Sequence, residues 1–401
     1  MRDIGIIGAG QAGLVLAIGL LKKGFNVSLY SQENEEEFLN GKIRSSQGIF
    51  NSALAIERKL QLNFWDTLAP KNDTVSFTLA DPVTLEKIIS WTGKTKDFYQ
   101  SIDQRLKFSR WLYEFRKLNG QLYIKKVDIS NIDNISKQHE LTVISTGKSE
   151  LNKLFEIDRI RSKYLTPQRA MCCIYVKNML SSPNLGVQAN IIPNVGEYFN
   201  MPGLTKNGQC TMMLFEGIPK KDFDCWNIEG SPETYLKKAK ELLTSFLPWE
   251  AERCSNIELT DNNAILAGGY TPIIRKPVSR LKSGKLLLGL GDSIVLNDPI
   301  AGQGANTATK ASYIYLEQII DRGQQSFDEE WMYNTFEKAW NQDGKNATKW
   351  TNLMLEPPSN HIIELMHKAT NNISIANALA NGFDDPNTLF PWIEYGNDIL
   401  I

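Results

Sequence analysis

Histidine, cysteine and long apolar runs are all scarce in this chain of 401 residues. Three scattered histidines (His139, His361 and His367) argue against a histidine-rich metal site and leave few candidates for a Ser-His-Asp triad. We therefore expect no metal site. The five cysteines form no Cys-x-x-Cys pair, and an odd number without regular spacing argues against a disulfide framework.

Signals for membranes and polyanions are missing as well. The longest apolar stretch near the N-terminus, Leu14 to Leu21, is too short to cross a bilayer and follows a glycine-rich turn instead of a basic region. Together with the lack of a disulfide framework in the cysteine spacing, this predicts a cytoplasmic protein. Lys and Arg number 44 and Asp and Glu 45, so the balance predicts a small-molecule partner, with no nucleic acid and no membrane.

The first thirty residues have a β-α-β pattern. Asp3 to Ile7 is predicted as a buried strand, a helix follows with apolar residues at positions 14, 17, 18 and 21, and Asn26 to Tyr30 is the second strand. Between the first strand and the helix stands the motif Gly8-x-Gly10-x-x-Gly13. Such glycines permit a tight turn, close approach of a pyrophosphate and close packing of helix on strand. The alternative is a glycine turn without a ligand.

One part of the usual dinucleotide signature is absent. Ser31 stands where an acidic residue normally ends the second strand, and Glu33 follows two residues later. This departure puts ribose recognition in doubt and argues mildly against an ordinary NAD site.

A second strand-loop-helix element lies far along the chain. Leu286 to Leu290 is predicted as a buried strand that ends at Gly291-Asp292, and Asp298 to Asn306 forms a loop before a helix. Asp292 suits a ribityl hydroxyl, and a helix N-terminus with bare amides suits the electron-rich edge of a flavin. A structural loop is the alternative, but two such elements in one chain favour a dinucleotide.

The pattern predicts an α/β fold with a Rossmann-like domain, an inserted β-sheet domain and a helical C-terminal region. Strand-like runs such as Ala170 to Val176 and Cys210 to Phe215 carry the insertion. We expect the domain limits to be 1–165 with 265–325 for FAD binding, 166–264 for substrate, and 326–401 for the helical region.

Six motifs are spread along nearly the whole chain. They are Gly8-Ala9-Gly10-Gln11-Ala12-Gly13, Thr146-Gly147-Lys148, Pro167-Gln168-Arg169-Ala170, Gly268-Gly269-x-x-Pro272-x-x-Arg275, Gly289-x-Gly291-Asp292 through Asn306, and Trp350-Thr351-Asn352. Together they make the chain resemble two-component, FAD-dependent styrene and indole monooxygenases, relatives of the aromatic hydroxylases. The segment Arg44-Ser45-Ser46-Gln47-Gly48-Ile49-Phe50-Asn51 is more similar to the indole enzymes, because styrene enzymes tend to have Asn and His near these positions.

The resemblance implies a flavin-dependent monooxygenase that epoxidises an electron-rich aromatic alkene with dioxygen, through a C4a-hydroperoxyflavin. The indole C2–C3 bond is favoured, with indigoid products, and styrene is next. Aromatic hydroxylases usually carry Asp-Gly where this chain has Thr146-Gly147, and a histidine soon after their Gly-Asp, which is absent after Asp292. Both departures fit an oxygenase that receives reduced FAD from a separate, NADH-dependent flavin reductase.

The resemblance also implies the site residues. No side chain is expected as a catalytic acid or base, since the flavin carries the chemistry. Arg44 is expected on a phosphate or the flavin, with a surface ion pair as the alternative, and Gln47 as an acceptor for the indole N–H or as an ordinary buried polar residue. Lys148 and Arg169 are expected in structural ion pairs, and Cys172 and Cys173 in a core strand. The expected cofactor residues are Gly8, Gly10, Gln11, Ala12, Gly13, Arg44, Asp292, Pro299, Gly302, Gly304, Ala305 and Asn306, and the expected pocket residues are Ser46, Gln47, Phe50 and Pro299.

Three rival functions stay open. A halogenase of this fold usually has a Trp-x-Trp-x-Ile-Pro signature, which is absent here. The missing Asp-Gly pair opposes a single-component aromatic hydroxylase. A non-catalytic FAD-binding protein is the third.

Overall fold

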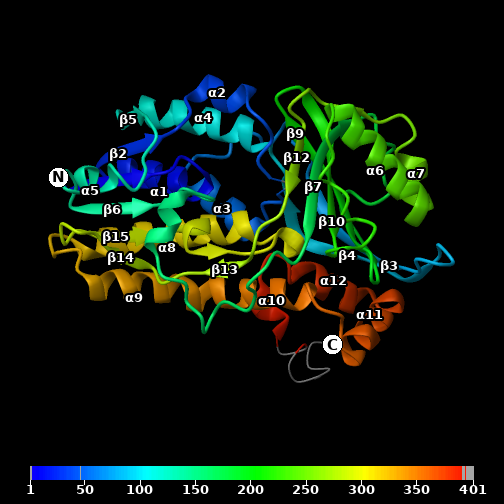
Figure 1. The fold of residues 1–401 in the computed structure, drawn as a ribbon. Coiled ribbons are helices and arrows are strands. Elements are labelled where there is room, and N and C mark those ends of the chain that lie inside the picture. The colour runs from blue at the N-terminus through cyan, green and yellow to red at the C-terminus, as the bar shows by residue number, and fades with distance from the viewer. Residues whose placement is uncertain (1, 46, 391–392, 394–401) are drawn as a thin grey trace.

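Two β-sheets and a group of C-terminal helices make up the fold in the computed structural model, which describes residues 2–45, 47–390 and 393 (Figure 1). The first sheet has six strands in the order β14-β15-β6-β1-β2-β5, parallel except for β14. These strands are β1 (Asp3–Ile7), β2 (Asn26–Ser31), β5 (Gln121–Ile124), β6 (Leu141–Ile144), β14 (Val278–Arg280) and β15 (Leu286–Gly289). The predicted return of the chain to this sheet is therefore seen in β15.

Helices pack against the first sheet and against one another. Helix α1 (Gln11–Lys22) is buried on every side over its first ten residues, which explains why its sequence is apolar all round. It packs against α8 (Gly304–Arg322) and α4 (Gln104–Lys117). A β-carbon on Gly19 would lie 2.6 Å from Leu316, so this glycine permits the close approach of α1 and α8. The shorter helices nearby are α2 (Glu35–Asn40), α3 (Asn51–Lys59) and α5 (Ile132–Ser136).

The second sheet is mostly antiparallel, in the order β11-β7-β10-β9-β8-β3-β4, with β12 also paired to β7. Its side chains alternate between two cores: Cys172 and Ile174 face α6 (Pro232–Phe246) and α7 (Pro248–Arg253), whereas Cys173 and Tyr175 face the opposite way. Its strands are β3 (Asn72–Ala80), β4 (Lys87–Tyr99), β7 (Ala170–Lys177), β8 (Gly186–Ile192), β9 (Gly196–Thr205), β10 (Gly208–Gly217), β11 (Glu258–Leu259) and β12 (Ile265–Gly268).

The hairpin β3–β4 differs from the expected organisation. We expected residues 1–165 to serve the first domain, but β3 pairs in parallel with β8, from Thr74 opposite Gly186 to Leu79 opposite Ile191. The hairpin thereby extends the second sheet. Its partner strand lies more than a hundred residues further along the chain, so local sequence patterns cannot predict this pairing.

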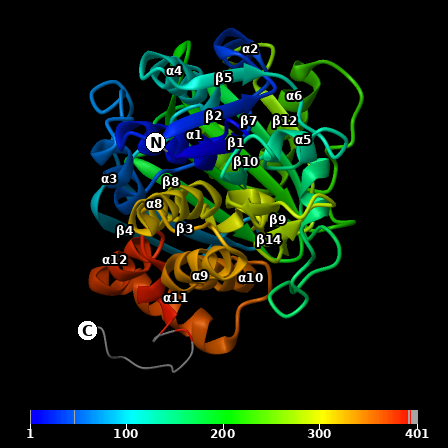
Figure 2. The ribbon, with the colours of Figure 1, turned by 90° about the vertical axis from the view of Figure 1, so that its left-hand side faces the viewer.

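The C-terminal helices cover the edge of this sheet and the underside of the first domain (Figures 1 and 2). Helix α12 (Ile373–Asn381) lies along β4, where Asn377 Oδ1 accepts the Lys94 N–H at 2.7 Å and Asn381 Oδ1 accepts the Lys96 N–H at 2.8 Å. These two bonds provide acceptors for backbone N–H groups of β4, the edge strand of the sheet. The remaining elements are α9 (Glu329–Ala339), a π-helical turn (Trp340–Gly344), α10 (Lys345–Met354), α11 (Asn360–Asn371) and the small sheet of β13 (Ile273–Ile274) and β16 (Val295–Leu296).

This architecture confirms the predicted α/β fold with a second sheet and C-terminal helices. Cys172 and Cys173 lie buried in β7, as expected, and the described residues contain no disulfide. None of the helices in the described residues combines the length and apolar character that crossing a bilayer requires.

Candidate functional site

The three glycines of the first motif have different surroundings: Gly8 and Gly13 are tightly packed, whereas Gly10 faces open space. A β-carbon on Gly8 would lie 2.3 Å from the Ser145 carbonyl oxygen, and one on Gly13 only 1.9 Å from the Gly8 carbonyl oxygen. These two glycines hold β1, β6 and α1 together. A β-carbon on Gly10 would meet nothing within 4 Å, so the backbone here has open space in front of it. No side chain of the described residues caps the α1 N-terminus, which leaves its N–H groups available to a phosphate.

The second loop presents the same kind of open backbone. It runs through the one-turn helices η2 (Gly291–Ser293) and η3 (Pro299–Ala301) to the uncapped start of α8. A β-carbon added to Gly302, whose φ is 64°, or to Gly304 would also meet no atom within 4 Å. A β-carbon on Gly291 would lie 3.0 Å from Ala12, so the two loops adjoin. Open glycines and free helix ends from both loops fit an FAD pyrophosphate and flavin edge.

A buried polar network fixes the first loop from behind. Gln11 Nε2 donates to Glu57 Oε1 and to Thr309 Oγ1, both at 2.8 Å, and Glu57 accepts from Lys107 Nζ at 2.7 Å. These four side chains are at least nine-tenths buried and come from α1, α3, α4 and α8. The Gln11 side chain therefore positions the loop, which leaves its backbone for the ligand.

Asp292 lies in η2, three residues after the end of β15. Its side chain is exposed to solvent, but partial desolvation by the surrounding protein raises the pKa of its carboxyl group to about 6, and the nearby Lys148 opposes this rise. Lys148 lies 3.6 Å from the centre of the Tyr270 ring, a cation–π contact in place of the expected ion pair. Lys148 is exposed as well, and partial desolvation lowers its pKa against the opposing effect of Asp292 and Asp298.

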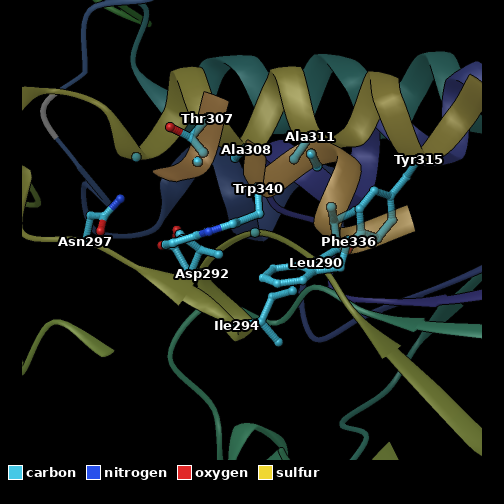
Figure 3. A pocket seen from close by; sticks show the side chains of 15 residues that line it. Leu290, Asp292, Ile294, Asn297, Thr307, Ala308, Ala311, Tyr315, Phe336 and Trp340 are labelled. Atoms are coloured by element: carbon cyan, nitrogen blue, oxygen red, sulfur yellow. The ribbon is translucent and has the colours of Figure 1, made fainter. Parts of the chain in front are cut away.

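Figure 3 shows a narrow cavity of about 20 Å³ beside Asp292, between η2, α8, α9 and the π-helical turn. Asp292, Asn297 and Thr307 line one end, while Leu290, Phe336 and Tyr315 line the other. Asn297 Nδ2 and Thr307 Oγ1 are buried without a partner among the described residues. The cavity admits about one water molecule and no flavin ring, so it supports the site from the side.

Arg44 forms an ion pair with Glu33, just after the end of β2, and lies 4.6 Å from the centre of the Phe38 ring. Both members of the pair are about one-third exposed. Arg44 therefore forms an ion pair, which was the alternative to a contact with a phosphate or the flavin. The pair also stands at the strand end where the ribose-binding acid is normally found.

The segment after Arg44 meets the second loop through Asn306. Its Oδ1 accepts the Phe50 N–H at 2.8 Å, and its Nδ2 donates to the carbonyl oxygens of Gly48 at 2.8 Å and Gly302 at 2.9 Å. Gln47 is buried and donates through Nε2 to the Ile102 carbonyl oxygen, while its Oε1 has no partner among the described residues. Ser46, the remaining predicted pocket residue, lies outside the described residues.

Two buried carboxyl groups beside this loop were not predicted. Glu216 of β10 and Asp298, the residue before Pro299, are both 0% exposed. Near them, Arg169 forms the expected ion pair, with Glu197, at 2.7 and 2.8 Å. A carboxylate directly after the apolar strand run Met212–Phe215 was the available signal, but only the fold brings Glu216 to Asp298.

Comparison with known proteins shows which enzymes the chain is similar to. Residues 147–253 match the family model described as "Styrene monooxygenase A putative substrate binding domain", and residues 3–73 match an FAD binding domain. Styrene monooxygenase StyA of Pseudomonas fluorescens is 28% identical over 362 residues, 88% of this chain and 85% of the relative. StyA of a Pseudomonas sp matches to the same extent. The chain is therefore similar to the styrene monooxygenases over most of its length, as the sequence motifs predicted.

These matches confirm the predicted enzyme class, a flavin-dependent monooxygenase, and the predicted cofactor, FAD. Solved structures share the fold. They include the flavin-dependent brominase Bmp2 (14% identity, 98% of both chains, TM-score 0.68) and a flavoprotein/dehydrogenase from Cytophaga hutchinsonii (14%, 99% of this chain and 97% of that one, TM-score 0.71). A third is p-nitrophenol 4-monooxygenase PnpA from Pseudomonas putida DLL-E4 (13%, 96% and 99%, TM-score 0.64).

Proposed function

We propose that this protein epoxidises an electron-rich aromatic alkene, with indole favoured and styrene next. The observation that carries the indole preference is Gln47, whose buried Oε1 has no hydrogen-bond partner among the described residues. An unfilled buried acceptor costs free energy, and an indole N–H would satisfy it. Styrene has no such donor.

The FAD site follows from the open backbone of the two loops. The amides of Gln11 and Ala12 bind the pyrophosphate in front of Gly10, and Asp292 accepts from a ribityl hydroxyl. Pro299, Gly302, Gly304, Ala305 and Asn306 border the ring system, and Arg44 with Glu33 stands at the ribose end. Bound in its reduced form, FAD supplies the activation of dioxygen.

An aromatic and aliphatic surface adjoins this site and excludes water. The Phe50 ring centre is 4.7 Å from that of Tyr99 and 6.1 Å from that of Phe383, which in turn contacts Trp350 at 5.8 Å. The loop from Gly291 to the start of α8 at Gly304, called the flavin loop below, contains Ile300. This side chain belongs to the same apolar cluster as Trp350 and one face of the second sheet. A flat aromatic substrate suits such surroundings, and the chain needs only to orient it and keep water away.

Dependence on a separate reductase is supported at the position after β6. The Thr146 N–H donates to Ser293 Oγ at 2.9 Å, and the Thr146 hydroxyl donates to Asn152 Oδ1 at 3.2 Å. Thr146 therefore stands where enzymes that also bind the nicotinamide cofactor are expected to have the aspartate of an Asp-Gly pair. We propose that an NADH-dependent flavin reductase delivers reduced FAD.

Product analysis tests this function. The protein is mixed with chemically reduced FAD, air-saturated buffer and either indole or styrene, without NADH or reductase. Indigoid pigment or styrene oxide is the expected result, with a higher yield from indole. Hydrogen peroxide alone from both substrates would contradict the proposal. Rapid reduction of bound FAD by NADH alone would instead indicate a single-component enzyme.

A further inference from the structure

Glu216 and Asp298 are two fully buried carboxyl groups at the flavin loop, and when both are ionised neither can donate a hydrogen bond to the other. As carboxylates, both oxygens of Glu216 and the Oδ2 of Asp298 have no hydrogen-bond partner among the described residues. The two side chains are nevertheless within hydrogen-bonding reach of each other. Two carboxylates cannot bond each other, so one of the pair must carry a proton.

The surrounding charges favour this proton. Arg169 donates two hydrogen bonds to Glu197, so among the described residues one buried guanidinium group faces the three carboxyl groups of Glu197, Glu216 and Asp298. Burial, Asp298 and Glu197 raise the pKa of Glu216 well above its ordinary value, and Arg169 only partly opposes them. The other ionisable groups that act on Asp298 or Glu216, or are acted on by them, are Lys148, Tyr164 and Tyr270, with Asp292 next to Lys148 and Tyr270.

The pair is joined directly to the loop that borders the flavin. Asp298 Oδ1 accepts the Ile300 N–H at 3.1 Å, which caps η3, and Pro299 is the next residue. Glu216 comes from the second sheet, where it lies opposite Glu197 of β9 and Met171 of β7. The pair therefore stands where the sheet of the second domain meets the flavin loop.

We propose that Glu216 and Asp298 share one proton and supply it to the flavin site in each turnover. The inference rests on the proposed oxygenation. Reduced FAD in its N1-deprotonated form provides two electrons and the hydrogen on N5, and dioxygen provides two oxygen atoms. One oxygen is inserted into the substrate, while the other leaves as water with the N5 hydrogen and one further proton. That proton comes from the pair, which solvent then reprotonates.

The variant Glu216→Gln separates proton supply from loop support. Its amide still donates a hydrogen bond to Asp298, so the loop and the FAD affinity are expected to stay as in the wild type, but it has no transferable proton. With chemically reduced FAD, air and indole, we expect the rate of product formation to fall at least about tenfold. The wild-type rate should decline as the pH rises and the pair loses its proton, whereas the low rate of the variant should be nearly independent of pH.

Infrared spectroscopy of the FAD-free protein gives a readout that does not depend on turnover. A carbonyl band of a protonated carboxylic acid is expected at neutral pH in the wild type and is expected to be lost in Glu216→Gln. The control Glu250→Gln removes another buried carboxylate of the second domain, which is paired with Arg253 at 2.7 Å, and should leave this band and the turnover rate unchanged.

The outcomes are distinguishable. Absence of the band at neutral pH, or a Glu216→Gln rate and pH profile equal to those of the wild type, would overturn the proton-sharing pair. Absence of oxygenated product from the wild type would instead contradict the proposed function, and the infrared result would still stand. If Glu216→Gln does not fold, Asp298→Asn provides the second variant, with the same expected loss of rate.

Discussion

Asn306 holds the backbone of Phe50 against the flavin loop. Its Oδ1 accepts the Phe50 N–H at 2.8 Å across 256 residues of sequence, and its Nδ2 binds Gly48 and Gly302 from the other side. One fully buried amide therefore joins the segment that carries the proposed substrate contacts to the loop that is proposed to border FAD. Ala305, at the start of α8, adds an apolar contact with Ile49, Ala53 and Leu54.

Removal of this amide should loosen both segments. Asn306→Ala leaves the Phe50 N–H and the Gly48 carbonyl buried without partners, a cost of about 2–4 kcal/mol in unfolding free energy. We expect a lower melting temperature and weaker FAD binding by titration. Asn306→Asp keeps the acceptor for Phe50 but turns a carboxylate oxygen toward the carbonyl oxygens of Gly48 and Gly302, so it should also lower the melting temperature. Equal FAD affinity in Asn306→Ala and the wild type would contradict the proposed contact of this loop with FAD.

Gly10 and Gly13 should differ sharply although they share one motif. In Gly13→Ala the new β-carbon would lie 1.9 Å from the Gly8 carbonyl oxygen, so the fold itself should be destabilised. In Gly10→Ala the β-carbon enters open space, so the protein should melt as the wild type does but bind FAD more weakly. Thermal melting and FAD titration on both variants test this pair. Normal FAD affinity in Gly10→Ala would remove the pyrophosphate from this position.

FAD affinity should depend on pH through Asp292. Its pKa of about 6 means that the carboxylate, the form that accepts from a ribityl hydroxyl, predominates only above this pH. We expect the dissociation constant for FAD to rise as the pH falls below about 6, and Asp292→Asn to bind FAD more weakly with a flatter pH profile. A flat profile in the wild type would contradict this assignment.

The raised pKa of Asp292 should make the FAD-free protein less stable as the pH rises, whereas the same rise in pH should make FAD binding tighter. The folded state holds the Asp292 proton more tightly than the unfolded state, since the pKa is raised from 3.8 to about 6. The contribution of Asp292 to stability should therefore decrease as the pH rises from about 4 to about 6. Melting temperatures of the wild type and Asp292→Asn across this range measure the difference.

Gln47 should discriminate between the two proposed substrates. Gln47→Met keeps the size of the side chain but removes the free Oε1, so indole loses its acceptor and styrene loses nothing. We expect kcat/KM for indole to fall by about tenfold relative to that for styrene, the cost of one lost hydrogen bond. Equal losses on both substrates would exclude Gln47 as the acceptor of the indole N–H.

The local elements of this protein could be predicted from its residues alone. The apolar residues after Gly13 predict α1, and the helix is indeed buried on every side over its first ten residues. Gly8, Gly10 and Gly13 lie in the predicted strand-turn-helix, and Asp292 follows β15 by three residues. In each case the physical cause acts over a few residues, so it can be read from the chain.

The meeting of distant segments could not be predicted in this way. The β3–β4 hairpin joins β8, Gln11 meets Glu57 and Thr309, and Glu216 meets Asp298. Strand pairing, buried amide networks and shared protons depend on which surfaces the fold brings together, and similar strands or polar residues elsewhere have the same local pattern. The residue types were present in the sequence, but their partners were set by packing.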